Sequence, residues 1–154
     1  MKRLFAVVAA LLVGFALASP VSAAEFGTRD EAVAIVKAAI AHAKSVGTEK
    51  AAAEFMDLNN KKWHDRDLYV VVIAKDGIRV AHGTNPKLAG KSFLDSVDVT
   101  GKAYGKETMD GAAAKGSGWV EYTFKDPVSQ KNLPKEVYYE KSGDLVFLSG
   151  VDKR

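Results

Sequence analysis

The sequence of 154 residues contains no cysteine, and this absence excludes several classes of protein. Without cysteine there is no disulfide framework, no thiolate metal site and no covalent haem attachment. The three histidines, His42, His64 and His82, are far apart in the sequence and lie on different predicted elements, so a metal site would need the fold to assemble it. We therefore expect neither a metal nor a cofactor.

Catalytic motifs are also missing. Gly116-Ser117-Gly118 lacks the spacing of a nucleophile elbow. There is no phosphate loop, no dinucleotide fingerprint and no H-E-x-x-H zinc motif. Because no nucleophile, base or metal set is in view, we expect a protein that is not an enzyme, and a hydrolase would need such a set to be assembled by the fold.

The charge balance argues against a nucleic-acid partner. The chain has 22 Lys+Arg against 19 Asp+Glu, a formal net charge of +3. Nucleic-acid binding needs basic residues concentrated on one face. Adjacent lysines such as Lys61-Lys62 are too few to make one, so no nucleic acid is expected as a partner.

The longest apolar run lies at the N-terminus. Met1-Lys2-Arg3 is basic, the stretch from Leu4 to Ala18 carries no charge, and small residues follow as far as Ala24, before the first acid, Glu25. A basic start, an apolar stretch of about fifteen residues and small residues at a cleavage site are typical of a secretory signal peptide.

We predict a signal peptide over residues 1–23, cleaved after Ala23 or, as the close alternative, after Ala24, and a mature domain over residues 24–154. An uncleaved anchor would need about 20 apolar residues, and this run is shorter and ends at Pro20. No later stretch is apolar over the roughly 18 residues that indicate a span. The mature protein is therefore predicted to be periplasmic or secreted and not embedded in a membrane, and its length suffices for a core without disulfides.

The mature sequence begins with two amphipathic helices. Apolar residues recur every three or four positions over residues 28–46, which predicts a helix. Thr28 with Glu31 three residues later predicts a capping box, and Gly47 is placed to end the helix. A second helix is predicted over residues 49–58.

Hairpin-connected strands make up most of the remaining sequence. Residues 68–74 are rich in β-branched side chains, as expected of a strand that is buried on both faces. Asp76-Gly77 and Ser142-Gly143-Asp144 are hairpin turns between β-type runs. Further strands are predicted at residues 78–82, 119–124, 135–141 and 145–150, with a short helix at 103–115. This order favours an α+β fold in which helices pack on an antiparallel sheet.

The connecting segments are predicted from their polarity. Residues 59–67 are polar and turn-like, and residues 83–98 predict a loop with a turn at Asn85-Pro86 and a helical turn near 92–96. A polar loop is predicted over residues 126–134.

Polar and aromatic side chains on the strands are the candidates for a binding site. His82 could donate a hydrogen bond to a ligand or be satisfied by its surroundings. Lys135 could bind an anion or be an edge charge that prevents sheet aggregation. Four aromatic residues offer an apolar body with a polar group, and they could line a pocket or belong to the core: Tyr69, Trp119, Tyr122 and Tyr138.

An ordered set of motifs carries a family resemblance. The motifs are DLYVVVI at 67–73, DG at 76–77, VAHGTNP at 80–86, LAGK at 88–91, GWVEY at 118–122 and LPKEVY at 133–138. Together they resemble the single Cache domain family of type 2 over residues 26–152. The resemblance implies a PAS-like single Cache domain, with a long N-terminal helix packed on a curved antiparallel sheet and a pocket between the sheet and its covering loops and helix.

The family resemblance also implies a function. Members of this family are extracytoplasmic sensor modules of bacterial chemoreceptors and histidine kinases, with stand-alone secreted members, and related domains bind a small organic acid such as acetate, propionate, pyruvate or lactate. The ligand-binding residues that it implies are the polar set His82, Tyr122, Lys135 and Tyr138 and the pocket walls Tyr69 and Trp119. In an unbroken strand, alternation puts Trp119 and Tyr122 on opposite faces, and likewise Lys135 and Tyr138 unless a bulge or a late strand start intervenes. At least one residue of each pair should therefore be structural.

In receptors of this family a membrane helix and a signalling module follow the domain, whereas this sequence ends at Arg154. We therefore expect a soluble extracytoplasmic small-molecule binding domain that feeds signal transduction or chemotaxis through a separate membrane receptor or kinase. The alternative is a protein-interaction module that docks on a membrane sensor or transporter without a ligand of its own.

Overall fold

The computed structural model describes residues 25–126 and 129–153. The predicted signal peptide, residues 1–23, lies outside the described residues and stays a prediction. Among the helices of the described part, none is both long and apolar enough to span a membrane.

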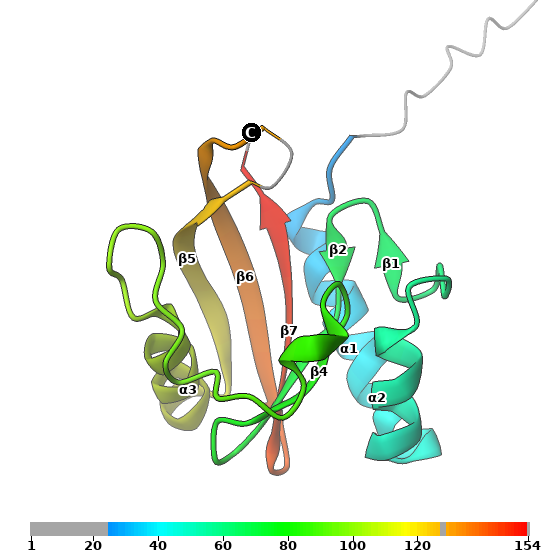
Figure 1. Cartoon of the computed structure of the whole chain (residues 1–154). Helices are drawn as coiled ribbons and strands as arrows, with labels where there is room; N and C mark the ends of the chain where they lie inside the picture. The colour runs from blue at the N-terminus through cyan, green and yellow to red at the C-terminus, as the bar shows by residue number, and fades with distance from the viewer. Residues whose placement is uncertain (1–24, 127–128, 154) are drawn as a thin grey trace, which may run out of the picture.

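A five-stranded antiparallel sheet forms the centre of the described structure (Figure 1). Its spatial order is β4-β3-β7-β6-β5. The strands are β3 (Val71–Ala74), β4 (Arg79–His82), β5 (Ser117–Lys125), β6 (Asn132–Ser142) and β7 (Leu145–Asp152). The two predicted hairpin turns connect β3 with β4 and β6 with β7, so the antiparallel sheet that the sequence predicts is confirmed.

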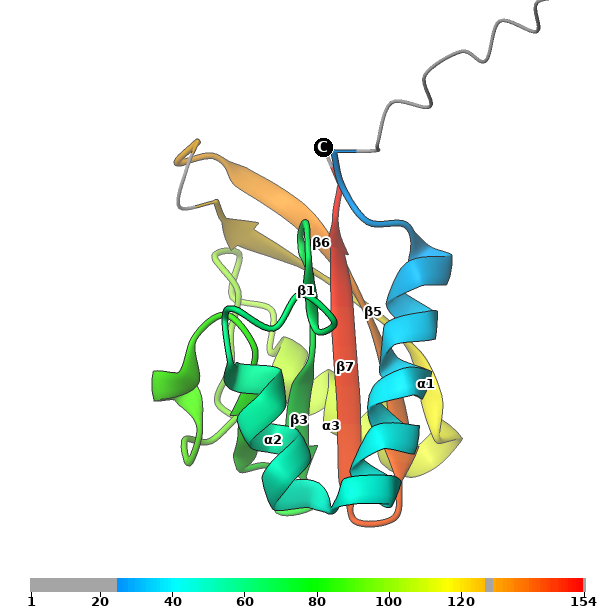
Figure 2. The ribbon, with the colours of Figure 1, turned by 90° about the vertical axis from the view of Figure 1, so that its right-hand side faces the viewer.

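Helices cover both faces of this sheet. Helices α1 (Arg29–Val46) and α2 (Thr48–Met56) lie on one face, and α3 (Tyr104–Lys115) lies on the other (Figure 2). The capping box of Thr28 and Glu31 is present at the start of α1. The α+β architecture with a long N-terminal helix is therefore as predicted.

The described core contains three clusters, and alternation along the strands separates the two larger ones. Val70 and Val72 belong to the cluster under α1 and α2, whereas Val71 and Ile73 belong to the cluster under α3. All four side chains are buried. This confirms the predicted strand segment that is buried on both faces.

The segment predicted as a polar turn over residues 59–67 contains part of the core, which corrects the prediction. Trp63 is only 1% exposed and packs edge-on against Phe55 at a centroid distance of 4.7 Å. The next residues form β1 (His64–Asp65), which pairs with β2 (Leu68–Tyr69). The predicted strand over 68–74 is therefore divided, because its first two residues pair with β1 rather than within the main sheet.

The covering loops also differ from the prediction. The turn expected near residues 92–96 is a single hydrogen-bonded turn, in which the N–H of Ser96 donates to the carbonyl of Phe93 at 3.0 Å. A short 3-10 helix, η1 (Pro86–Leu88), lies earlier in the chain. Hydrogen bonds hold the later segment against the β3–β4 turn. The N–H of Phe93 donates to the carbonyl of Gly77 at 2.7 Å, and Ser92 bridges to Ile78.

Two glycines inside α3 allow the helix to approach its neighbours closely. A Cβ on Gly105 would lie 1.9 Å from the carbonyl oxygen of Phe93, and one on Gly111 would lie 2.3 Å from the Tyr139 hydroxyl. Tyr139 is buried and belongs to the core cluster under α3. The glycines that weaken the intrinsic helix propensity of this segment are thus explained by packing.

We expect Gly111→Ala to destabilise the protein by about 1–3 kcal/mol, because the new methyl group overpacks the site of the Tyr139 ring. Urea unfolding measures the effect. In a Tyr139→Leu background the same substitution should become neutral or stabilising, since the better helix propensity of alanine then acts alone, at up to about 1 kcal/mol. An equal loss in both backgrounds would contradict this explanation.

Candidate functional site

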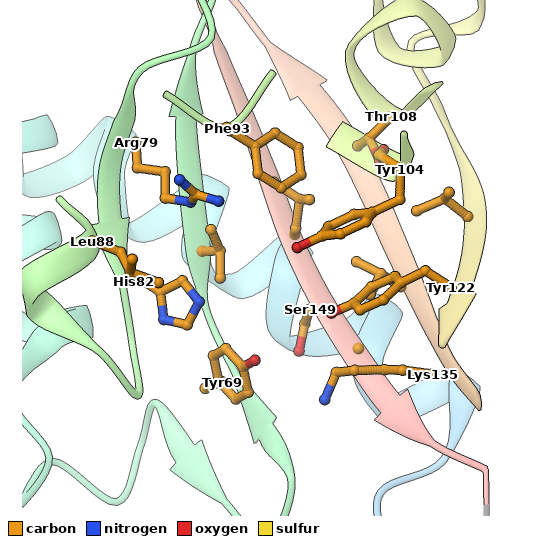
Figure 3. A pocket seen from close by; sticks show the side chains of 15 residues that line it. Tyr69, Arg79, His82, Leu88, Phe93, Tyr104, Thr108, Tyr122, Lys135 and Ser149 are labelled. Carbon is orange, nitrogen blue, oxygen red and sulfur yellow. The ribbon is translucent and has the colours of Figure 1, made fainter. Parts of the chain in front are cut away.

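A cavity of about 90 Å³ lies on the α3 side of the sheet (Figure 3). Because roughly 10–15 Å³ of such volume already holds one water molecule, the cavity has room for a molecule of several non-hydrogen atoms. Its polar lining residues are Tyr69, Arg79, His82, Tyr104, Thr108, Tyr122, Lys135 and Ser149, and its apolar ones include Val71, Leu88, Phe93, Val120, Val137 and Leu148. No carboxylate side chain is among the described residues that line it.

Four of the six predicted site residues line this cavity: Tyr69, His82, Tyr122 and Lys135. The other two, Trp119 and Tyr138, lie on the opposite face of the sheet, with ring centroids 5.4 Å apart. The Arg29 guanidinium of α1 lies 3.9 Å from the centre of the Trp119 ring. The separation within each pair that strand alternation predicts is therefore present, and it places Trp119 and Tyr138 in the packing under α1.

A bulge in β4 brings the side chains of Arg79 and His82 to the same cavity. Val72 pairs with Ala81 but Ile73 pairs with Arg79, so one residue of β4 is left over. Such an extra residue reverses the alternation beyond it. As a result Arg79 and His82, three positions apart, face the same cavity, which alternation in an unbroken strand forbids.

Arg79 is a buried cation without a counter-charge in the described part of the chain. It is 9% exposed, and its guanidinium donates to the Ser92 carbonyl at 2.5 Å and to the Ser96 hydroxyl at 2.6 Å. No Asp or Glu of the described residues forms an ion pair with it. Burial lowers its pKa, but a guanidinium keeps its proton in proteins. The cavity therefore carries a positive charge.

His82 is a neutral hydrogen-bond donor at this cavity. Burial, followed by the neighbouring charges of Arg79 and Lys135, lowers its pKa to about 4. The N–H of Asn85 donates to its Nδ1 at 3.2 Å, so the proton of the neutral ring is on Nε2. Figure 3 shows the ring at the cavity wall, where Nε2–H is available to an acceptor.

Lys135 is already neutralised by a buried partner. Its Nζ donates to Asp152 at 2.8 Å, and the two side chains are 7% and 8% exposed. Burial acts to lower the pKa of Lys135, but Tyr69 and Asp152 outweigh it, so the pKa is raised. A Cβ on Gly150 would lie 2.8 Å from the lysine Cε, so glycine is needed where the lysine stem crosses β7.

Asp67 links this ion pair to both ends of the described domain. One of its carboxylate oxygens accepts from the N–H of Gly27 at 2.6 Å, and the other accepts from the N–H of Asp152 at 2.8 Å. Gly27 precedes α1, and Asp152 is the last residue of β7. Figure 1 shows these two ends of the chain side by side.

Tyrosine hydroxyls complete the polar lining. The rings of Tyr104 and Tyr122 are stacked at a centroid distance of 4.0 Å. Burial raises the pKa of Tyr122 well above its usual value, so it remains a protonated donor. No hydrogen bond joins the hydroxyls of Tyr69, Tyr104 or Tyr122 to another described residue. The cavity thus offers one uncompensated cation and several donors, which is the chemistry that binds a small anion.

The described part of the cavity also contains polar residues outside the predicted set. Arg79 and Tyr104 are additional polar residues that the sequence did not single out. Neither Thr108, whose hydroxyl donates to the Tyr104 carbonyl, nor any other lining side chain forms a nucleophile–base pair. No group of three His, Cys, Asp or Glu side chains in this part of the chain could hold a metal ion.

Comparison with known proteins identifies a matching family model, described as Single Cache domain 2, over residues 25–144. No curated protein matches the chain. Among solved structures, a methyl-accepting chemotaxis protein from Vibrio parahaemolyticus is similar, with 22% identity and a TM-score of 0.66 over 80% of this chain and 86% of that one.

Two further structures have the same fold. A periplasmic sensor domain of a chemotaxis protein shows 25% identity and a TM-score of 0.62 over 81% of this chain and 90% of that one. A third, described as a Cache chemosensory domain with carboxylic acid recognition, shows 21% identity and a TM-score of 0.65 over 81% of this chain and 92% of that one.

Proposed function

The chain belongs to the single Cache domain 2 family, and from this membership we propose that it is an extracytoplasmic sensor-type domain that binds a small organic acid. The observation that carries the proposal is Arg79, a buried guanidinium at the cavity with no ion-pair partner among the described residues. A buried charge is expected to be paired. A ligand carboxylate would supply the missing partner.

The remaining lining favours a short acid. Beside Arg79, the Nε2–H of His82 and the tyrosine hydroxyls can donate to carboxylate oxygens, and charge-assisted hydrogen bonds of this kind are about twice as strong as neutral ones. Val71, Val120 and Leu148 offer an apolar wall for a methyl or ethyl group. Acetate, propionate, pyruvate and lactate have the charge and size that a cavity of about 90 Å³ accepts.

The charges favour one carboxylate rather than two. Arg79 is the unpaired cation of the described lining, whereas Lys135 is held by Asp152. A second ligand carboxylate would be buried without a partner, which is strongly unfavourable. The solved relative described by its carboxylic acid recognition supports an acid as the ligand, and our proposal is a monocarboxylate.

The cellular setting is part of the proposal. A cleaved signal peptide over residues 1–23 would deliver the domain of residues 24–154 to the periplasm or the exterior. There it would act without catalysis, passing ligand occupancy to a separate membrane receptor or kinase in signal transduction or chemotaxis. A ligand-free interaction module is less well supported, because Trp119 does not fill the cavity but packs on the other face.

A thermal-shift series on the exported protein tests the proposed ligand class. Acetate, propionate, pyruvate and lactate are compared with succinate, a dicarboxylate, and with ethanol, which lacks the charge. A ligand present at 100 times its dissociation constant stabilises by about 2.7 kcal/mol, so at least one monocarboxylate should raise the melting temperature by about 10 °C. A flat response to all four would contradict the proposal.

A further inference from the structure

The imidazole of His64 lies between two backbone carbonyls. Its Nδ1 is 3.1 Å from the oxygen of Asn60, and its Nε2 is 2.9 Å from the oxygen of Gly83. Carbonyl oxygens only accept hydrogen bonds, and a neutral imidazole has a single N–H. The neutral ring can therefore satisfy one contact and turns a lone pair towards the other oxygen. Only the doubly protonated ring donates to both.

The lack of a side chain at Gly83 allows its close contact with His64. A Cβ at this position would lie 3.2 Å from Nε2 of His64 and 2.9 Å from the Cβ of Tyr69. The N–H of Gly83 donates to the carbonyl of Val70 at 2.9 Å, which holds the backbone of Gly83 beside Val70. The absence of a side chain thus lets the imidazole reach the backbone at the point where the chain leaves β4.

Gly83 begins the loop of residues 83–90, which we call the lid. The lid contributes Leu88 to the cavity wall. Its Asn85 N–H donates to Nδ1 of His82, and its Gly90 N–H donates to the carbonyl of Arg79 at 2.7 Å. Hydrogen bonds near the two ends of the lid therefore contact His82 and Arg79, which both present N–H donors to the cavity.

We propose that His64 is a positioning residue: in its doubly protonated form it fastens Gly83 to the Asn60 turn, and thereby holds the lid and His82 in the ligand-binding arrangement. Proton binding at His64 and ligand binding in the cavity then strengthen one another, because coupling between two sites is reciprocal. Ligand affinity consequently rises as the pH falls. The ligand in this inference comes from the proposed function, whereas the role of the His64 proton in holding the lid does not depend on that function.

In the described part of the chain, no carboxylate near His64 competes with the two carbonyl oxygens for its N–H groups. Tyr69 lies opposite His64 in the β1–β2 pair. The ring centroids of Tyr69 and His82 of β4 are 5.4 Å apart. The adjacent Asp65 is paired with Arg66 at 2.6 Å. No carboxylate of the described residues forms an ion pair with His64.

The other titratable groups of the site do not change charge in the range where histidine side chains do, about pH 5 to 8. His82, with its pKa of about 4, stays neutral there. A carboxylic acid ligand stays ionised, as model carboxyl groups do above about pH 5. A carboxylate bound beside His82 acts to raise the pKa of that ring, so the His64→Gln variant, and not the pH dependence alone, assigns the effect to His64.

Calorimetric titration of the exported protein with pyruvate at about pH 5.5 and about pH 8 tests the proposal. We expect about fivefold tighter binding at the lower pH, the low end of measured coupling between sites. Proton uptake on binding, measured near pH 6.5 in buffers of different ionisation enthalpy, should accompany it. His64→Gln, which cannot donate from both ends of its amide, should remove both the pH dependence and the proton uptake.

His42→Gln is the matched control. His42 is also partly buried, but its Nε2 faces the carboxylate of Glu54 at 2.8 Å, so its contact needs no second proton donor. This variant should keep the wild-type pH dependence. Equal affinities at the two pH values in the wild type, or an unchanged slope in His64→Gln, would overturn the proposal.

A ligand-free measurement separates this inference from the proposed function. Ring nitrogen shifts of His64 should show both nitrogens protonated at about pH 5.5, and hydrogen-exchange protection of the Asn85 amide should decrease when His64 loses its proton. If pyruvate and the other short acids bind at no pH, the proposed ligand class fails while this result still decides the role of His64. Lid protection that does not follow the His64 ring overturns that role.

Discussion

Substitution of Arg79 by methionine should weaken binding of a short monocarboxylate by about 30-fold or more. Removing one partner of a buried, hydrogen-bonded charge pair costs about 2–5 kcal/mol, and each 1.4 kcal/mol is a factor of ten in affinity. Methionine preserves the length of the side chain but leaves the ligand carboxylate without its cation. Calorimetric titration with pyruvate or acetate measures the loss.

The same substitution should leave the ligand-free protein at least as stable as the wild type. Without ligand, Arg79 is a buried charge that the described residues do not neutralise, and its replacement by an apolar side chain removes that desolvation penalty. The hydrogen bonds to Ser92 and Ser96 are lost in exchange. Lys75→Met, which changes an exposed cation, is the control and should alter neither quantity. Unchanged affinity in the Arg79 variant would refute the assigned role.

Asp152→Asn should lower the free energy of unfolding by about 3–5 kcal/mol, the usual consequence of leaving a buried charge without its partner. Lys135 remains at that position, with only 7% of its side chain exposed. The raised pKa of Lys135 gives the pH dependence. The stabilisation by the pair is present below the pKa of the unfolded lysine and is lost as the pH rises through the folded pKa. Urea unfolding at neutral and alkaline pH measures both effects.

Two further variants test whether the stability loss in Asp152→Asn comes from the burial of the ion pair. Asp144→Asn breaks the Lys75–Asp144 pair, whose side chains are 70% and 75% exposed, and should change stability by less than about 1 kcal/mol. Lys135→Met combined with Asp152→Asn should recover part of the loss, since it removes the unpaired charge. If Asp144→Asn lowered the free energy of unfolding more than Asp152→Asn does, the buried Lys135–Asp152 pair would not be the stabilising one.

Local sequence patterns were sufficient to predict most of the fold. The capping box of Thr28 and Glu31 and the hairpin turns at Asp76-Gly77 and Ser142-Gly143-Asp144 depend on nearby residues, and each is present. Trp63 was missed because its polar neighbours predict a turn, while its burial depends on Phe55 in another element. Burial of this kind depends on contacts that no local pattern contains.

The candidate site could be predicted only in part for a related reason. Alternation correctly separated Tyr122 from Trp119, because β5 is regular. It gave no indication of Arg79, because the bulge in β4 shifts the register between Val72 and Ile73. In the sequence, Arg79 is recognisable only as a basic residue inside a short strand. Many solvent-exposed strand positions carry such a residue, so the pattern does not indicate a binding site.

The carboxylate of Asp67 has a mechanical consequence. Because it holds the N–H of Gly27 and the N–H of Asp152 at once, tension applied to either end of the domain loads the same side chain. Asp152 passes that load to Lys135 in the cavity wall. The two ends of the domain are thus expected to move together. A displacement there would reach Lys135 in the cavity wall through these hydrogen bonds and not through the helices.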